Sequence, residues 1–161
     1  MAASGWPADW DERLAGKGCP LCAGLGRGDN EHAVHVWDGA CAEVHLARRT
    51  VVPGYCTVTW AGPHVADPAD LSPDDAARYW ADVLAVGRAI RTVFQPVKMN
   101  YLLLGNFVPH LHTHVVPRYR DDPAAGGPLS WETLVGAEAT SAEELTRQAA
   151  NLRAALRRHA G

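Results

Sequence analysis

Three histidines alternate with other residues in the stretch His110-Leu111-His112-Thr113-His114. Successive side chains of a β-strand point to opposite faces of the sheet. An extended backbone here therefore places the three imidazoles on one face, with roughly 7 Å between neighbours. Such a row can hold a metal ion, contact phosphate oxygens, or supply a nucleophile and a proton donor side by side. The stretch predicts a strand that carries a functional site.

Four further strands are predicted around this one. The five strand-like runs are 32–37, 40–48, 55–61, 98–105 and 110–116. The first three are separated by Asp38-Gly39 and Pro53-Gly54, which are turn signals, so this half of the chain is expected to be an antiparallel meander.

Two helices are predicted from capping signals and apolar spacing. The first begins at Ser72, an N-cap residue followed by proline and two acids, and continues to the break at Pro96. The second begins at Ser141 and ends in a basic turn near His159. The predicted class is α+β: an antiparallel five-stranded sheet with a long helix packed on it, plus a C-terminal helix.

The composition sets limits on the function. A chain of 161 residues with 47% hydrophobic residues is the size of one domain with its own core. A formal net charge of -3 gives no general attraction to long nucleic acids or anionic membranes. The sequence contains no long apolar run, so we expect a soluble, cytoplasmic protein. The cysteines are then expected to be reduced thiols or metal ligands.

Cys19 and Cys22 form the one cysteine pair with metal-ligand spacing. The same spacing occurs in redox pairs, but no strand precedes this one as it does in thioredoxin-like folds. A metal set completed by His32 and His35 is disfavoured, because its spacings are too short for the common zinc finger.

The run from Asn100 to Arg118 resembles the signature of the histidine triad (HIT) family of nucleotide-binding proteins, in which histidines alternate with apolar residues. Thr113 is its one polar departure, and the Pro117-Arg118 that follows is similar to the branch of dinucleoside polyphosphate hydrolases. The resemblance implies the same five-stranded sheet, usually in a homodimer. The resemblance covers roughly Cys19 to Tyr119 and does not place the two ends. The expected organisation is an irregular lead-in (1–18), a catalytic domain (19–120), and a linker and helix packed on that domain (121–161).

The resemblance also implies a reaction. In the family, the middle histidine, here His112, attacks the α-phosphorus of a nucleotide and forms a nucleotidyl-histidine intermediate, which water or another acceptor resolves. His114 would contact the phosphoryl oxygens. By position, Asn106 and Asn100 would be the amides that bind phosphate.

A structural zinc site is implied by similarity to the wider superfamily, which includes the galactose-1-phosphate uridylyltransferases. Matching positions here give Cys19, Cys22, His64 and His110 as ligands. Two thiolates and two imidazoles form a closed tetrahedral set.

Other positions leave substrate recognition open. The aspartate that usually holds the ribose is absent after the second strand. Apolar residues of the first two strands are expected to line a base pocket: Val34, Val36 and Val44. Arg118 suits either a phosphate contact or an ordinary surface ion pair.

Three functions therefore compete. The leading hypothesis is a nucleotide hydrolase or nucleotidyltransferase that cleaves a P–O–P or P–N bond at the α-phosphate. The second is a metallohydrolase using all three histidines, although a straight strand spreads them over about 13 Å, too far for a single ion. The third is a nucleotide-binding regulatory module with little turnover.

Overall fold

The protein is described by a computed structural model that covers residues 5–135 and 138–159. Its centre is one antiparallel five-stranded sheet in the order β1-β2-β3-β5-β4. The strands are β1 (Ala33–Asp38), β2 (Ala42–Ala47), β3 (Cys56–Trp60), β4 (Lys98–Leu102) and β5 (His112–Arg118). The predicted sheet and fold class are confirmed.

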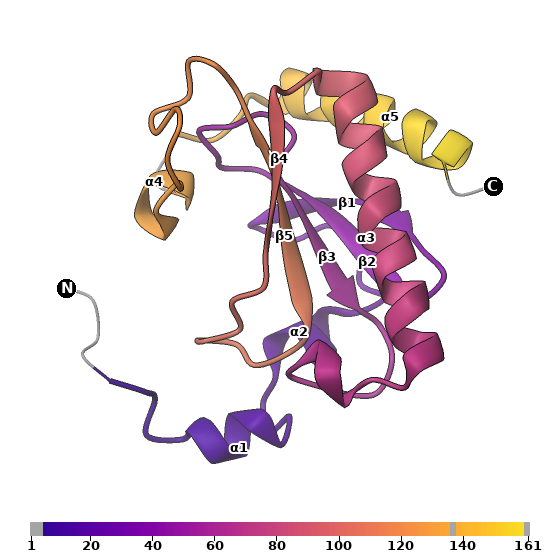
Figure 1. Ribbon diagram of the computed structural model, residues 1–161, viewed down its shortest axis with the longest axis vertical. Helices are drawn as coiled ribbons and strands as arrows, with labels where there is room; N and C mark the ends of the chain where they lie inside the picture. Colours follow the sequence, from indigo (N-terminus) through magenta and orange to yellow (C-terminus); the bar gives the residue numbers. More distant parts are fainter. Residues whose placement is uncertain (1–4, 136–137, 160–161) are drawn as a thin grey trace.

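Two long helices, α3 (Pro73–Phe94) and α5 (Ala142–His159), lie on one side of this sheet, while α4 (Trp131–Val135) lies on the other (Figure 1). The capping signals of α3 act as the sequence predicts, because the Ser72 hydroxyl accepts the backbone N–H of Asp75. Gln95 ends the helix in the left-handed conformation, with φ 52°.

The main hydrophobic core lies between the sheet and the two long helices. Val34, Val36 and Val44 belong to it and pack with residues of α3 and α5. Their expected role in a base pocket is therefore wrong. Alternate residues of β1 and β2 point to opposite faces, and these valines occupy the face that the helices bury.

The opposite face of the sheet is polar near its centre. The strand register places Thr59 beside His112, and Thr57 beside His114. A smaller hydrophobic cluster covers the end of this face, where Leu134 of α4 packs with Tyr55. The imidazoles of His112 and His114 therefore lie on a face that is only partly covered, with His114 more deeply buried than His112.

Several short elements were not predicted from sequence. Residues of the expected irregular lead-in form α1 (Trp10–Leu14), and Cys19 is the N-cap of α2 (Pro20–Gly24), which contains Cys22. A short 3₁₀ helix, η1 (Pro68–Asp70), precedes α3, and α4 follows the 120–130 connection. The parts of the predicted terminal segments at 1–4 and 160–161 lie outside the described residues. Among the described helices, none combines the length and apolarity required to cross a bilayer.

Candidate functional site

His112 and His114 lie side by side on β5, with ring centroids 4.8 Å apart. The residue between them, Thr113, points into the core on the opposite face and is fully buried. Pairing of β5 with both β3 and β4 fixes the direction of these side chains. The two imidazoles are therefore held by a central strand rather than by a loop.

Both rings line an open pocket of about 400 Å³. Its other walls come from the connection between β4 and β5 and from α4: Leu104, Gly105, Asn106, Phe107, Val108 and Trp131. The Trp131 ring lies edge-on to His114, with centroids 5.3 Å apart. The pocket thus has two imidazoles at its base and mainly apolar walls, a combination that suits a ligand with a phosphate and an apolar ring.

The orientation of His112 is set by a backbone hydrogen bond. Its Nδ1 lies 2.6 Å from the carbonyl oxygen of His110. A carbonyl can only accept, so Nδ1 carries the proton and Nε2 keeps a free lone pair. Burial lowers the pKa of His112 below its usual value. The ring is thus neutral near pH 7, with the lone pair of Nε2 unshared.

His114 is engaged by a tyrosine. Its Nδ1 lies 2.7 Å from the hydroxyl oxygen of Tyr55, which directly precedes β3. Burial, with a smaller contribution from His112, lowers the pKa of His114 to about 4. Burial also raises the pKa of Tyr55 to about 12. Tyr55 was not identified from the sequence, because its position beside His114 follows only from the pairing of β3 with β5.

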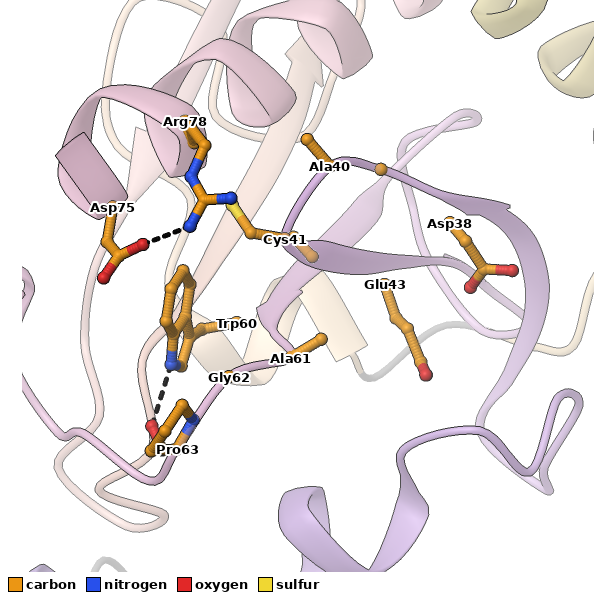
Figure 2. Close-up of a pocket in the computed structure, with 12 residues that line it drawn as sticks. Asp38, Ala40, Cys41, Glu43, Trp60, Ala61, Gly62, Pro63, Asp75 and Arg78 are labelled. Atoms are coloured by element: carbon orange, nitrogen blue, oxygen red, sulfur yellow. Dashed lines mark hydrogen bonds and ion pairs between the residues drawn. The ribbon is translucent and has the colours of Figure 1, made fainter.

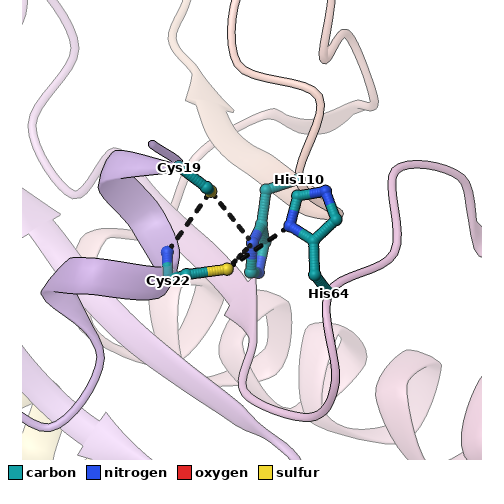
Figure 3. Close-up of side chains that lie close together, drawn as sticks. All are labelled: Cys19, Cys22, His64 and His110. Atoms are coloured by element: carbon teal, nitrogen blue, oxygen red, sulfur yellow. Dashed lines mark hydrogen bonds between the residues drawn. The ribbon is translucent and has the colours of Figure 1, made fainter. Parts of the chain in front are cut away.

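The four residues predicted to hold a metal come together at the N-terminal end of β5 (Figure 3). Their potential ligand atoms all lie within 4.8 Å of one another. Cys19 and Cys22 come from the start of α2, His64 from the loop after β3, and His110 from the segment before β5. The cluster joins three parts of the chain that are distant in sequence.

The distances in the cluster fit a tetrahedral ion. Nδ1 of His110 lies 3.5 Å from the Cys19 sulfur and 3.3 Å from the Cys22 sulfur. Nδ1 of His64 lies 3.3 Å from the Cys22 sulfur. A tetrahedral zinc with ordinary bond lengths separates sulfur and nitrogen ligands by about 3.5 Å. The donor set can therefore close around one ion with little movement.

A hydrogen bond on the other side of the His110 ring orients it as a metal ligand. Its Nε2 donates to the carbonyl oxygen of Trp60 at 2.8 Å, which leaves the lone pair on Nδ1, the atom that faces the cysteines. His32 and His35 lie outside the cluster: His32 pairs with Glu31, and His35 pairs with Asp38.

The remaining predicted site residues separate into two groups. Asn106 lines the pocket with the imidazoles. Asn100, on β4, lies outside that pocket, and its amide oxygen accepts a hydrogen bond from Arg118 at 2.9 Å. Its predicted phosphate contact is therefore not supported. Arg118 itself is buried in a bidentate ion pair with Asp122, at 2.7 and 2.9 Å, which answers the question that the sequence left open.

A second pocket, of about 450 Å³, lies at the β1–β2 turn and the start of α3 (Figure 2). Two contacts lie within it: Arg78 pairs with Asp75, and the Trp60 indole donates to the Pro63 backbone carbonyl at 2.8 Å. None of the triad histidines lines it.

Sequence relatives and solved structures are similar to this chain. A bis(5'-adenosyl)-triphosphatase of Saccharomyces cerevisiae is 27% identical over 77 residues, which is 45% of this chain and 37% of the yeast protein. "Protein hit" of Bacillus subtilis is 31% identical over 75 residues, which is 44% of this chain and 50% of that protein. The matched stretch thus spans half or less of each relative.

The fold is shared with solved histidine triad proteins. One from Marinobacter aquaeolei is 23% identical, with a TM-score of 0.72 over 92% of this chain and 96% of that one. A Zn-bound one from Mycobacterium smegmatis is 23% identical, with a TM-score of 0.62 over 88% and 94%. The family model of the HIT domain matches residues 31–121, more than half of the chain. On this match and on the arrangement of its histidines, the chain belongs to the HIT domain family.

Proposed function

We propose that the protein cleaves nucleoside phosphates at the α-phosphate through a nucleotidyl-histidine intermediate on His112. The observation that carries this proposal is the hydrogen bond from His112 Nδ1–H to the His110 carbonyl, at 2.6 Å. It leaves the Nε2 lone pair of a pocket-lining imidazole free to attack phosphorus. The catalytic unit would be residues 19–120, with 121–161 packed on it.

The proposed reaction has two displacements. In the first, Nε2 of His112 forms a bond to the α-phosphorus and the leaving group departs with its electron pair. The ring becomes a cation, which the His110 carbonyl stabilises through Nδ1–H. In the second, water attacks phosphorus and releases one proton to the solvent, while the P–N bond breaks with its electron pair going to Nε2. His112 leaves as a neutral imidazole, because Nδ1 has kept its proton. In the second displacement the group that leaves phosphorus is a neutral imidazole, which is a weak base and therefore a good leaving group.

His114 and Asn106 are the proposed phosphate contacts. Both line the pocket beside His112, and each can present an N–H donor to the phosphoryl oxygens. Charge builds up on these oxygens in the transition state, so fixed donors there accelerate the reaction. Asn100 has no part in this arrangement, because Arg118 engages it elsewhere.

Zinc is the ion we propose for the cluster of Cys19, Cys22, His64 and His110. When bound, it would supply a closed, structural four-ligand site and hold α2 against the start of β5. The His110–Trp60 hydrogen bond supports this assignment, because it presents Nδ1 as a ligand. No step of the proposed reaction passes through the metal. A cytoplasmic location is part of the proposal, since the cysteines must stay reduced.

We also propose a homodimer. Strand β4 is an edge of the sheet, and apolar side chains around it and on α3 are exposed: Leu84, Val97, Tyr101, Leu103 and Leu104. An edge strand with apolar neighbours favours pairing with a second copy. Light scattering during size-exclusion chromatography would measure the mass directly, and a monomer at micromolar concentration would contradict this part.

The test of the function is to trap the intermediate. The protein is mixed with a bis(5'-adenosyl)-triphosphate radiolabelled at the α-phosphate and quenched in base, which preserves a phosphoramidate bond. We expect label on the wild-type chain and none on His112→Ala, with turnover lost by at least about a thousandfold. His32→Ala is the matched control, because this exposed imidazole lies outside the pocket.

Two outcomes would overturn the proposal. Undiminished turnover by His112→Ala would exclude the nucleophile. Tight nucleotide binding with wild-type turnover at the background rate would identify a binding module instead. A metallohydrolase using three histidines has less support, since Nδ1 of both His112 and His114 is already hydrogen-bonded and His110 lies with the cysteines.

A further inference from the structure

The hydroxyl of Tyr55 and Nδ1 of His114 form a buried pair, 2.7 Å apart. Tyr55 is 4% exposed and His114 is 6% exposed. Tyr55 packs in the small cluster under α4, together with Val52, Val116 and Leu134. The Tyr55 ring cannot turn away without opening that cluster, and the pairing of β5 with β3 and β4 fixes the direction of the His114 side chain.

The direction of this hydrogen bond follows from the two groups. A phenol is a stronger hydrogen-bond donor than a neutral imidazole N–H, and an imidazole nitrogen is a stronger acceptor than a phenol oxygen. Burial raises the pKa of Tyr55 to about 12, so the phenol keeps its proton. The O–H of Tyr55 therefore donates to Nδ1 of His114. The proton of the neutral ring is then on Nε2, the nitrogen left to the pocket.

The surroundings of His114 favour the neutral ring. Its neighbours are His112, the Trp131 ring, Thr57 across the strand pair with β3, and Leu102 across the pair with β4. Among the described residues, no carboxylate is hydrogen-bonded to it, and no ion pair includes it. Without a nearby anion, a buried imidazole does not gain a second proton near pH 7.

The state of this ring determines which leaving groups the site can expel. When a P–O–P bond breaks, the electron pair leaves with a phosphate that is stable as an anion, so no proton is required. When a P–N bond breaks, the amine nitrogen must first gain a proton, because an amide anion is far too basic to leave. A neutral Nε2–H can hydrogen-bond to the phosphoryl oxygens, but it is too weak an acid to supply that proton.

We propose that Tyr55 is a positioning residue that keeps His114 as the neutral Nε2–H tautomer, and that the site consequently prefers phosphoanhydride over phosphoramidate substrates. This inference rests on the proposed function, because it names the substrate class of the same pocket. The Tyr55 hydroxyl touches neither substrate nor phosphorus and acts only through His114.

The first test measures the tautomer without any turnover. Long-range ¹H–¹⁵N spectra of the metal-loaded protein, with ¹⁵N-labelled histidine, distinguish a protonated ring nitrogen from one with a lone pair. We expect His114 to show Nε2 protonated and Nδ1 as an acceptor at about pH 7.5. In Tyr55→Phe, which keeps the ring in its cluster, we expect the Nδ1 signal to shift toward a free lone pair and the tautomers to mix. Tyr119→Phe is the matched control, since that hydroxyl donates to the Pro53 carbonyl at 2.7 Å, away from His114.

The second test compares two substrates, bis(5'-adenosyl)-triphosphate and an adenosine 5'-phosphoramidate. We expect the wild-type kcat/KM to be at least about tenfold higher for the anhydride. For Tyr55→Phe, we expect its kcat on the anhydride to fall about tenfold with little change in KM, because a transition-state contact loses its alignment. The ratio of the two kcat/KM values should move toward the phosphoramidate.

Any of three results would overturn the inference while leaving the His112 mechanism intact. The first is a wild-type spectrum in which His114 carries its proton on Nδ1 or on both nitrogens. The second is a higher wild-type kcat/KM for the phosphoramidate, and the third is a Tyr55→Phe variant whose ratio of the two kcat/KM values equals that of wild type. Failure of the proposed function would instead appear as label or turnover that survives His112→Ala, whatever the tautomer of His114.

Discussion

The hydroxyl of Tyr79 on α3 lies 2.8 Å from the hydroxyl of Thr113, the residue between the two pocket histidines. Tyr79 is fully buried, and its hydroxyl also donates to the Val58 carbonyl at 3.1 Å. The Tyr79 oxygen can thus donate to the carbonyl and accept from Thr113, so both buried hydroxyls are satisfied. The polar residue in an otherwise apolar position of the motif thereby ties β5 to the long helix.

This pair gives a stability prediction. Tyr79→Phe removes the partner of both Thr113 and the Val58 carbonyl, so we expect it to lower the free energy of unfolding by about 1–3 kcal/mol. Thr113→Val should cost less, because Tyr79 keeps its bond to the carbonyl. Urea unfolding of both single variants and of the double variant would measure the coupling. Strictly additive effects would show that the two hydroxyls do not interact.

The buried ion pair of Arg118 and Asp122 predicts sensitivity to acid. The Arg118 guanidinium, helped by backbone N–H donors, lowers the pKa of Asp122 from 3.8 to about 2. A carboxyl whose pKa is lower in the folded state stabilises the fold above its unfolded pKa, and this contribution is lost as the pH falls through about 4 toward 2. A shift of this size is worth about 2 kcal/mol.

Unfolding in urea at about pH 6 and about pH 2.5 would test this assignment. We expect Asp122→Asn to be less stable than wild type by about 2 kcal/mol at the higher pH and by less than about 1 kcal/mol at the lower pH, where the native carboxyl begins to gain its proton. The neighbouring exposed residue Asp121 offers the control Asp121→Asn, which should follow wild type at both values. Parallel losses at both pH values for Asp122→Asn would show that the effect is not electrostatic.

The cluster of Cys19, Cys22, His64 and His110 predicts that binding of a metal ion stabilises the folded protein. Because the ligands come from α2, the loop after β3 and the start of β5, removal of the ion should lower the unfolding temperature and release the N-terminal segment to proteolysis. Cys22→Ser should contain far less zinc by elemental analysis and lose the thiolate absorption of a Co²⁺-substituted site. Cys41→Ser is the control, since Cys41 lies outside the cluster beside Asp82. An unchanged unfolding temperature after complete chelation would contradict the assignment.

Trp131 gives a prediction about binding. Its indole is 47% exposed and forms one wall of the pocket beside His114. Trp131→Ala should raise KM for an adenine nucleotide about tenfold, since stacking an aromatic ring on a base contributes on the order of 1–3 kcal/mol. Trp6→Ala removes another exposed indole that is outside the pocket and should leave KM unchanged. Equal KM values for Trp131→Ala and wild type would exclude this wall from substrate binding.

Much of the fold could be predicted from sequence because local signals agreed with the final packing. Ser72 and Pro73 start a helix in isolation, and the same helix is required to cover the sheet. The turn at Asp38-Gly39 is likewise indicated by a local signal. The contact that stabilises it is not local, because the buried carboxylate of Asp82 accepts hydrogen bonds from the N–H groups of Ala40 and Cys41. That contact joins residues 42 and 41 positions apart in the chain, and no local pattern reveals it.

The site was only partly predictable for the same reason. The alternation of histidines indicates which rings share a face, but it does not show what stands beside them. Tyr55 and Trp131 reach His114 only after β3 pairs with β5 and α4 folds over the sheet. The helices α1, α2 and α4 have five residues each, too short to produce a periodic pattern. Their conformation depends on tertiary contacts.

The distance along the chain between the cluster residues has a thermodynamic consequence. Cys19 and His110 are 91 positions apart, yet their side chains touch. An ion held by both would act as a reversible cross-link that closes most of the polypeptide into a loop. By analogy with a disulfide, a loop of this size removes chain entropy worth on the order of 4 kcal/mol from the unfolded ensemble. The lifetime of the folded protein would then depend on the supply of that metal ion.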